Sequence, residues 1–355
     1  MSSTGPSNTI FDPALRRYSR QMLFAPIGEA GQRKLAASRV TLIGCGALGS
    51  VQAEILVRAG VGHVRICDRD FVEWANLHRQ ALCDEDDIEA GLPKAEAARR
   101  KLIRINSQVE VESVVTDVNP ANIERLTEDA DLILDGTDNF ETRYLINDAA
   151  VKHGTPWVHG AAIADTGLCM AVLPGETPCL RCVFEDAPPL EMSPTCDTVG
   201  VLGPLIHMVA GSQASEAIKI LIGHRDAVNR NLVSLDAWTG RFTDIAVADA
   251  RERGNCICCK QRQFEYLDGD RISLTTNPCG RDAIQVNRKG GRTIVLPALA
   301  KRLRPVASEV RANVHLVKAT VGDYELIVFV DGRAIVKGTD DPDVAKAIYA
   351  KHVPT

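Results

Sequence analysis

The sequence predicts an α/β protein: a doubly wound, mainly parallel sheet of Rossmann-like type with an antiparallel extension, followed by a small α+β domain. Three observations predict this architecture. An apolar strand at 40–43 runs into the glycine turn Gly44-Cys-Gly-Ala-Leu-Gly49, after which helices and strands alternate. From Trp157 onward the pattern becomes antiparallel, and the last part of the chain contains short strands and helices. We therefore expect domains at 1–262 and 263–355.

The N-terminal elements follow from their caps and their order. Asp12-Pro13 is a helix-start signal, because Asp caps a first turn and Pro fits its first position, so a short Arg-rich helix is expected over 14–24. A second helix is expected over 27–37. The helix after the glycine turn leads to a strand at 64–67 that ends at Asp68. Strand, glycine turn, helix and strand form the first unit of a doubly wound sheet.

The remaining elements alternate in the first domain and become shorter in the second. Helices are expected at 93–105, 123–126, 199–222 (with a kink near Gly203-Pro204), 297–303 and 343–351. Strands are expected at 109–115, 132–134, 166–173, 232–235, 241–247, 272–276, 283–286, 314–319, 324–330 and 334–337. An Asp-Gly pair at 331–332 predicts a hairpin between the last two strands.

Composition limits the classes of function. Hydrophobic residues make up 45% of the 355 residues, which allows a sizeable core, and the net charge of -5 argues against a nucleic-acid binder that relies on broad positive charge. The N-terminus has no signal-peptide core, and the most apolar stretch, 199–210, is too short to span a membrane. We expect a cytosolic protein without membrane or direct nucleic-acid partners. Eleven cysteines in that compartment suggest metal binding and catalysis more than disulfides.

Two CxxC pairs predict a metal site. Two residues separate Cys179 from Cys182 and Cys256 from Cys259, a spacing that lets both thiolates of each knuckle face one ion. Four thiolates are the tetrahedral set that Zn²⁺ prefers, and they leave no open position, so the site is expected to be structural. The alternative is a set of scattered core cysteines. Cys258 crowds the second knuckle, but Cys256 and Cys259 keep the CxxC spacing.

The glycine turn and Asp68 together predict an adenosine cofactor. Backbone amides and a helix N-terminus bind any phosphate, and an acid at the end of the next strand hydrogen-bonds ribose hydroxyls. These features fit NAD, FAD or ATP equally. A tight structural turn beside a surface acid is the alternative.

Nearby charges favour a nucleoside triphosphate over NAD. Arg79 and Lys94 follow the ribose acid, and cleavage of a triphosphate needs cations on the leaving pyrophosphate. Asp138 ends a buried strand, where a carboxylate is placed to hold Mg²⁺. Taken singly, Arg79 and Lys94 also fit solvated surface charges.

At this point the residues match a known family. The chain resembles the ThiF/MoeB adenylyltransferases, relatives of the ubiquitin-activating enzymes, over about its first 260 residues. The resemblance is carried by motifs in the family's order: Arg17-Tyr-Ser-Arg20-Gln21, the glycine turn, Asp68-Arg-Asp70, Asn76-Leu-His-Arg79-Gln80, Pro93-Lys94, Asp135-Gly-Thr-Asp138-Asn139, both knuckles, and Thr195-Cys196 before Gly200-Val-Leu-Gly-Pro204.

The resemblance implies a symmetric homodimer that adenylates a ubiquitin-like sulfur-carrier protein at its C-terminal Gly-Gly carboxylate, with ATP, Mg²⁺ and structural Zn²⁺. It implies that Arg20 reaches into the partner's site and stabilises phosphate charge together with Arg79 and Lys94, while Asp138 holds Mg²⁺. The implied nucleotide-binding residues are Gly44, Gly46, Gly49, Asp68, Asn76, Arg79, Lys94, Asp138 and Asn139. A cysteine desulfurase or a rhodanese is the implied type of sulfur donor.

Two further cysteines need separate treatment. The position of Cys196 carries, in the resembling family, the cysteine that takes a thioester or persulfide linkage; a dispensable loop cysteine is the alternative. We expect adenylation to proceed without Cys196 and later sulfur transfer to need it. In the second domain, Cys279-Gly-Arg281 fits a sulfur-relay cysteine, although a carrier-docking or dimer-supporting module with an incidental cysteine fits equally.

The remaining cysteines and histidines predict no chemistry. Cys45 and Cys67 are expected to be small core residues. No ligand-like spacing is found for His78, His153, His159 and His207, and each is expected to pack or to make a satisfied hydrogen bond.

Three other functions remain open from the sequence. A nicotinamide-dependent oxidoreductase explains the glycine turn and Asp68 but not the cations or the knuckles. A non-catalytic carrier-binding scaffold has no need of Arg20, Arg79, Lys94 and Asp138. Activation of another carboxylate, such as that of a modified nucleoside or a peptide terminus, is not excluded.

Overall fold

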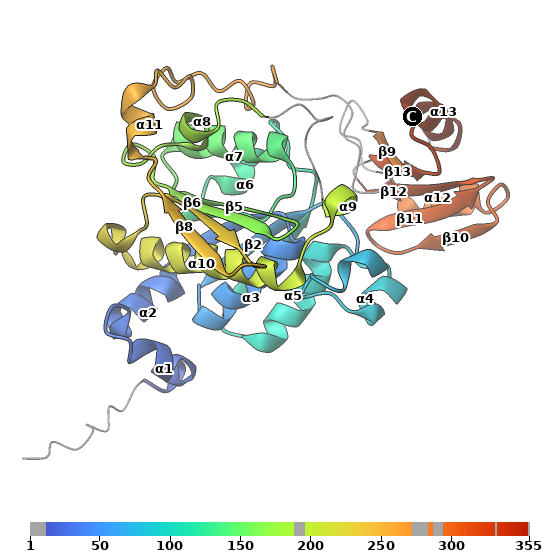
Figure 1. Cartoon of the computed structure of the whole chain (residues 1–355). Helices are drawn as coiled ribbons and strands as arrows, with labels where there is room; N and C mark the ends of the chain where they lie inside the picture. Colours follow the sequence, from blue (N-terminus) through green and yellow to red (C-terminus); the bar gives the residue numbers. More distant parts are fainter. Residues whose placement is uncertain (1–11, 188–195, 272–282, 287–293, 331, 354–355) are drawn as a thin grey trace, which may run out of the picture. The chain divides into compact units, whose positions relative to one another are not determined.

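A computed structural model describes residues 12–187, 196–271, 283–286, 294–330 and 332–353. The chain divides into two compact units, Met1–Asp270 and Arg271–Thr355 (Figure 1). The first unit extends beyond the expected end at residue 262, because Phe264, Tyr266 and Leu267 pack into its core. Within the described residues, no helix is long and apolar enough to cross a membrane.

The first unit is built on one eight-stranded sheet. Its order is β3-β2-β1-β4-β5-β6-β7-β8, in which the first five strands run parallel and the last three pair antiparallel. The strands are β1 (Arg39–Ile43), β2 (His63–Asp68), β3 (Glu110–Val115), β4 (Leu132–Asp135), β5 (Trp157–Ile163), β6 (Thr166–Val172), β7 (Leu232–Asp236) and β8 (Arg241–Ile245). This confirms the predicted doubly wound sheet with an antiparallel extension.

Helices cover both faces of this sheet (Figure 1). One face packs against α2 (Gly28–Ala37), α3 (Ala47–Ala59), α5 (Lys94–Ile105) and α10 (Gly203–Ile222). The other face packs against α6 (Ile123–Thr127), α7 (Phe140–His153), α8 (Leu180–Val183) and the segment that contains the second knuckle. Shorter elements connect these layers: η1 (Pro13–Tyr18), α1 (Ser19–Met22), η2 (Trp74–Asn76), α4 (Glu85–Glu89), α9 (Cys196–Val199), η4 (Arg225–Ala227) and α11 (Ala248–Arg253). The sheet is therefore the central layer of three.

Two helix predictions need correction. The helix expected over 14–24 is a 3₁₀ turn followed by one short α-helical turn, η1 and α1. The long helix expected from residue 199 begins at Gly203, and Pro204 occupies its first turn, where the missing N–H costs no hydrogen bond. Gly203-Pro204 thus starts α10 instead of kinking it.

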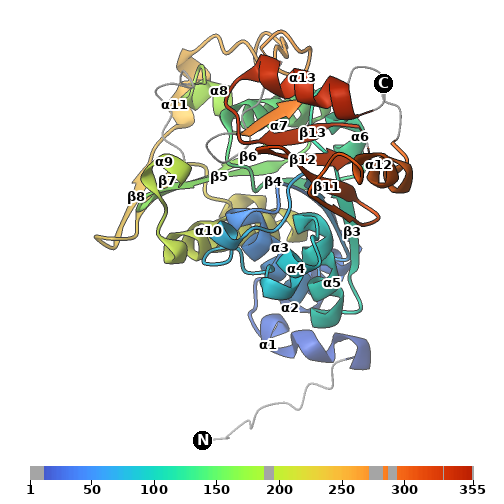
Figure 2. The same ribbon diagram turned by 90° about the vertical axis from the view of Figure 1, so that its right-hand side faces the viewer.

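The second unit is a five-stranded antiparallel sheet with two helices beside it (Figure 2). The order β10-β11-β12-β13-β9 includes a strand, β10, that the sequence did not predict. The elements are β9 (Ala283–Val286), α12 (Leu296–Leu303), β10 (Glu309–Ala312), β11 (Leu316–Val321), β12 (Tyr324–Phe329), β13 (Ala334–Lys337) and α13 (Pro342–His352). Both helices pack on one face of the sheet. The strand expected at 272–276 and the Cys279-Gly-Arg281 segment lie outside the described residues.

Candidate nucleotide site and cysteine cluster

The glycine turn, Asp68 and Asp138 lie at one edge of the sheet. β1 pairs in parallel with β2 and with β4, and Ile43 is level with both Cys67 and Asp135, so the three strands end together. Successive strands are added on one side of β1 first and then, from β4 onward, on its other side. Ligands of open α/β sheets bind outside the carboxyl ends of the strands at such a reversal.

Packing explains two of the three glycines in the turn. Gly44 has a φ of 91°, and a Cβ there would lie 2.6 Å from the carbonyl oxygen of Gly136. A Cβ on Gly49 would lie 2.0 Å from the carbonyl oxygen of Gly44. At Gly46 a Cβ would meet nothing nearer than Nε2 of Gln80, at 3.9 Å. Gly46 immediately precedes α3, so the missing side chain leaves the free N–H groups of that helix end open to an anion.

Asp68 is a buried carboxylate fixed by the backbone. Its two oxygens accept hydrogen bonds from the N–H groups of Cys45 and Asp70, each at 2.6 Å. Burial, together with the neighbouring carboxylate of Asp70, raises the pKa of Asp68 to about 6 against the opposing effect of Lys94. The hydrogen bond from Cys45 ties this acid directly to the glycine turn.

Lys94 supplies a buried cation beside Asp68. Its Nζ lies 3.1 Å from Oδ2 of Asp70, and the side chain is nearly inaccessible to solvent. Burial by itself lowers the pKa of Lys94, but the carboxylates of Asp70, Asp68 and Asp138 outweigh it and hold the pKa well above its ordinary value. The ammonium therefore stays charged at any physiological pH.

Arg69 adds a second cation to the same cluster. Its Nη1 lies 2.8 Å from Oδ1 of Asp117, and its Nε lies 3.7 Å from Oδ1 of Asp70. Burial lowers the pKa of Arg69, whereas Asp117, Asp70 and Asp138 raise it far above its ordinary value. Asp138 itself is exposed just beyond β4 and acts on both cations. This arrangement of alternating charges can receive a divalent cation and a polyphosphate.

Asn76 and Arg79 lie on a segment that borders the turn. Asn76 is buried, and its Oδ1 accepts the N–H of Glu73 in the capping box of η2. Arg79 is half-buried, and its Nη1 donates to the carbonyl oxygen of Ala75 at 2.6 Å. No acid among the described residues pairs with its guanidinium. Gln80, next in the chain, faces Gly46, so this segment lies beside the end of α3.

Arg20 lies far from these residues within one chain. The ring of Tyr18 packs against Gly60, and Nε2 of Gln21 donates to the carbonyl oxygen of Ala59, so α1 contacts the C-terminal end of α3. The glycine turn lies at the other end of this helix, roughly 20 Å away at 1.5 Å per residue. Arg20 is exposed. The structure therefore does not bring it to the nucleotide edge of its own chain.

A buried ionic group supports the loop that carries Asp138. Asp135 is inaccessible to solvent; its Oδ2 lies 2.8 Å from Nδ1 of His159 and 3.3 Å from Nε of Arg143. Its Oδ1 accepts from the N–H and hydroxyl of Thr137. Burial raises the pKa of Asp135, but Arg143 and His159 outweigh it and lower the pKa overall. The expected hydrogen bond of His159 is thus confirmed.

Asn139 has a structural partner in this loop. Its Oδ1 accepts the N–H of Thr142 at 2.8 Å and caps α7. Whether its amide also meets a nucleotide stays a prediction. Several charged residues of the site were not selected from the sequence: Arg69, Asp70, Asp117, Asp135 and Arg143. The repeated acid in Asp68-Arg-Asp70 and the acid after the strand at 110–115 were the available signals.

The four knuckle thiols come together as one cluster. Sγ of Cys179 lies 3.7 Å from Cys182 and 3.6 Å from Cys256, and Cys182 lies 3.4 Å from Cys259. All four sulfur atoms lie within 4.8 Å of one another. A tetrahedral Zn²⁺ with bonds of about 2.3 Å separates its ligands by about 3.8 Å, so this donor set fits zinc. Cys258 is outside the group, and its sulfur accepts from Nδ2 of Asn147.

Three further cysteines among the described residues are buried. Cys67 and Cys169 are buried, and burial raises the pKa of each thiol to about 12; Cys45 is buried in the glycine turn. Cys196 begins the short helix α9, which precedes α10 as a separate element. The environment of the Cys196 side chain is outside what the structure describes, so its catalytic role stays a prediction.

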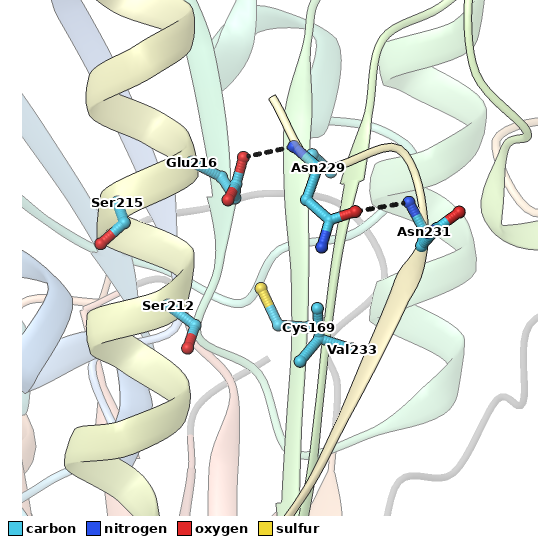
Figure 3. A pocket seen from close by; sticks show the side chains of 8 residues that line it. Cys169, Ser212, Ser215, Glu216, Asn229, Asn231 and Val233 are labelled. Atoms are coloured by element: carbon cyan, nitrogen blue, oxygen red, sulfur yellow. Dashed lines mark hydrogen bonds between the residues drawn. The ribbon is translucent and has the colours of Figure 1, made fainter. Parts of the chain in front are cut away.

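A small cavity of about 180 Å³ lies between α10 and strands β6 and β7 (Figure 3). Cys169 lies on its strand side and Ser212 and Glu216 on its helix side. Oε2 of Glu216 accepts the N–H of Asn229 at 2.9 Å. None of its lining residues belongs to the nucleotide edge or to the thiol cluster.

Known proteins are similar to this chain over most of its length. The chain is 44% identical to the sulfur carrier protein ThiS adenylyltransferase of Bacillus subtilis over 337 residues, 95% of this chain and 99% of that protein. It is 36% identical to the SAMP-activating enzyme E1 of Haloferax volcanii, with 73% and 96% covered. The adenylyltransferase and sulfurtransferase MOCS3 of Xenopus laevis is 30% identical, with 97% and 70% covered.

Solved structures share the fold. E. coli MccB in complex with MccA-N7isoASN matches with a TM-score of 0.60 at 22% identity, covering 70% of this chain and 75% of that one. PaaA matches with a TM-score of 0.56 at 22% identity, covering 70% and 77%. Residues 18–259 match the ThiF family, and with the relatives above this shows that the chain belongs to the ThiF family.

Proposed function

We propose that this protein uses ATP to adenylate the C-terminal Gly-Gly carboxylate of a ubiquitin-like sulfur-carrier protein and releases pyrophosphate. The observation that carries the proposal is the cluster of paired charges around Asp68, Lys94 and Asp138 at the point where the sheet reverses. NAD brings only a pyrophosphate, whereas a triphosphate with Mg²⁺ matches a site that holds buried cations beside an exposed carboxylate. The 44% identity to a ThiS adenylyltransferase indicates the carrier as substrate.

Each residue has a physical task in this proposal. The turn around Gly46 and the start of α3 bind phosphates, and Asp68 and Asn76 orient the nucleoside. Lys94 and Arg79 stabilise negative charge on the phosphates. Arg69 is paired with Asp117 and adds positive charge to the same region. Asp138 holds Mg²⁺. No general base is needed, because the attacking carboxylate is already ionised at neutral pH.

Arg20 acts from a second subunit in this proposal. Its distance from the nucleotide edge of its own chain, the length of α3, supports a role in the partner's site. The protein is therefore expected to work as a homodimer. The four knuckle cysteines hold a structural Zn²⁺, which takes no part in the reaction. Later sulfur transfer through Cys196 would draw on a separate donor, such as a cysteine desulfurase or a rhodanese.

ATP–pyrophosphate exchange against a panel of carrier proteins tests the activity. Exchange is expected only with a carrier that ends in Gly-Gly, and removal of the terminal glycine should reduce it to background. Exchange that is independent of every carrier, or tight NAD binding in place of ATP, would contradict the proposal.

A mixed-dimer experiment tests the position of Arg20. R20A and D138N homodimers are each expected to be inactive in exchange. A heterodimer of the two chains has one site with both functional residues if Arg20 acts across the dimer, and none if it acts within its own chain. Recovery of up to half of the wild-type rate per dimer is therefore expected, and no recovery would exclude action in trans.

A further inference from the structure

Helix α7 joins the nucleotide edge to the thiol cluster. It starts directly after Asp138 and Asn139, and its residues Arg143 and Asn147 are four positions apart. Residues at that spacing lie next to each other on one helix face. Both side chains are buried, Arg143 with 6% of its surface exposed and Asn147 with none. One rigid helix turn therefore separates two buried polar groups that face different functional regions.

Arg143 holds the loop before Asp138. Its Nη2 donates to the carbonyl oxygen of Thr137 at 2.8 Å, while its Nε lies 3.3 Å from Asp135. Asp135 accepts from the N–H and hydroxyl of the same threonine. Thr137, the residue before Asp138, is thus held through its N–H and hydroxyl groups, which donate, and through its carbonyl oxygen, which accepts. Gly136 packs against the glycine turn, where a Cβ would lie 2.5 Å from the carbonyl oxygen of Gly44.

Asn147 bridges the two knuckles. Its Oδ1 accepts the N–H of Leu180, which lies inside the first knuckle, at 2.9 Å. Its Nδ2 lies 3.3 Å from the sulfur of Cys258, which lies inside the second. The next residue, Asp148, accepts the N–H groups of Tyr266 and Leu267 and so fixes the segment that follows the second knuckle. One helix turn therefore contacts all the chain segments that carry the cluster.

We propose that Asn147 is a positioning residue that holds the two cysteine knuckles in register for the metal, and that α7 transmits the order of the knuckles through Arg143 to the loop that carries Asp138. Partners that orient metal ligands through a second layer of hydrogen bonds typically change metal affinity by 10- to 100-fold when removed. The bridging contacts stand independently of the reaction; only the use of Asp138 in catalysis depends on the proposed function.

Metal release measures the first part. N147L keeps the branched shape of the side chain, although leucine is larger, and removes both hydrogen bonds. Zinc transfer from the folded protein to a coloured chelator should accelerate at least tenfold. C258A removes the acceptor of Nδ2, together with the contact of the thiol with Asp148, and should accelerate release less. C258S restores a side chain that can make both contacts and should return toward the wild-type rate. N106L is the matched control: it removes another buried asparagine, which bonds Tyr18 and Val57 away from the cluster, and should lower stability without faster release.

Three outcomes would overturn this part. Zinc release at the wild-type rate from N147L and C258A would show that the hydrogen bonds of Asn147 do not hold the thiol cluster. Equal acceleration in N106L would reduce the effect to general destabilisation. Loss of one full zinc equivalent in C258A, with retention in C259A, would make Cys258 a ligand in place of Cys259. If N147L does not fold, the pair C258A and C258S still decides the question.

Amide hydrogen exchange measures the second part on the wild-type protein, with and without zinc. The amides of Thr137 and Thr142 are protected by Asp135 and Asn139. Removing zinc should increase their exchange at least several-fold, as R143M should in the zinc-loaded protein. The amides of β3, which is the edge strand of the sheet and three positions from β4, should stay unchanged. Faster exchange confined to the knuckles would refute transmission through α7. Neither readout requires a carrier or turnover, so failure here is separable from failure of the proposed adenylation.

Discussion

The nucleotide edge and the thiol cluster are two polar regions of one unit that are built on opposite principles. At the nucleotide edge, acids and cations neutralise each other: Lys94 pairs with Asp70, and Arg69 with Asp117. In the thiol cluster the four groups that meet are of one kind, all cysteine thiols. Charge pairs keep the first region in shape without a ligand, whereas four thiolates repel one another and need a metal to stay together. Ligand removal should therefore affect folding at the cluster, and side-chain changes should affect chemistry at the nucleotide edge.

The largest expected effect follows from removing zinc. A Zn²⁺ held by the four thiolates would close the long loop between Cys182 and Cys256, and such a cross-link stabilises a fold by about 4 kcal/mol through the entropy of the unfolded chain. The melting temperature of the first unit should fall by about 10 °C or more in the zinc-free protein. Calorimetry before and after chelation measures this. An unchanged melting temperature would show that packing alone holds the knuckles.

The next effect concerns Asp138, the exposed acid of the nucleotide edge. D138N keeps the size of the side chain and removes the charge that would hold Mg²⁺, and ATP–pyrophosphate exchange should fall by about 10²–10³-fold. Because the side chain is exposed, the melting temperature should stay within about 1 °C, since surface substitutions cost little. D226N, on an exposed turn, serves as the matched control. Pyrophosphate exchange near the wild-type rate in D138N would indicate that another carboxylate of the cluster holds the Mg²⁺.

The sequence predicted these two regions unequally, for physical reasons. Spacing within one segment identified Cys179, Cys182, Cys256 and Cys259, because CxxC geometry is local. The glycine turn and Asp68 were readable for the same reason. The ion pairs of Arg69 and Asp117 join strands that are distant in sequence, and only the register of the sheet brings them together.

The start of α10 and the position of the N-terminal segment also depend on contacts that a local sequence pattern does not specify. A proline in an apolar run fits both a kink and a first turn, and the structure places Pro204 in the first turn of α10. The distance of Arg20 from its own nucleotide edge depends on how α1 packs against α3. Nothing local in the sequence specifies that contact, so the family resemblance alone indicated a role across the dimer.

A smaller effect should appear with pH at Asp68. Its pKa is raised to about 6 in the folded protein, above the ordinary 3.8, so lowering the pH from 8 to 5.5 protonates it and weakens its acceptance of ribose hydroxyls. The KM for ATP should rise several-fold over this range, and D68N should flatten the change. The sign for stability is opposite: an acid whose pKa is raised by folding favours the folded state as pH falls through 6. A KM for ATP with the same pH dependence in D68N would assign the titration to another group.

The smallest effect is expected at Cys196, which separates activation from transfer. Adenylation requires positioning of ATP and carboxylate and stabilisation of phosphate charge, none of which uses a thiol, so C196A should exchange pyrophosphate at the wild-type rate. A covalent carrier adduct, seen by mass spectrometry under non-reducing conditions, should disappear in C196A and persist in C169A, whose buried thiol has its pKa raised to about 12. Collapse of exchange in C196A would place this cysteine in the first chemical step. The paired charges of the nucleotide edge would then not be sufficient for adenylation without the segment around α9.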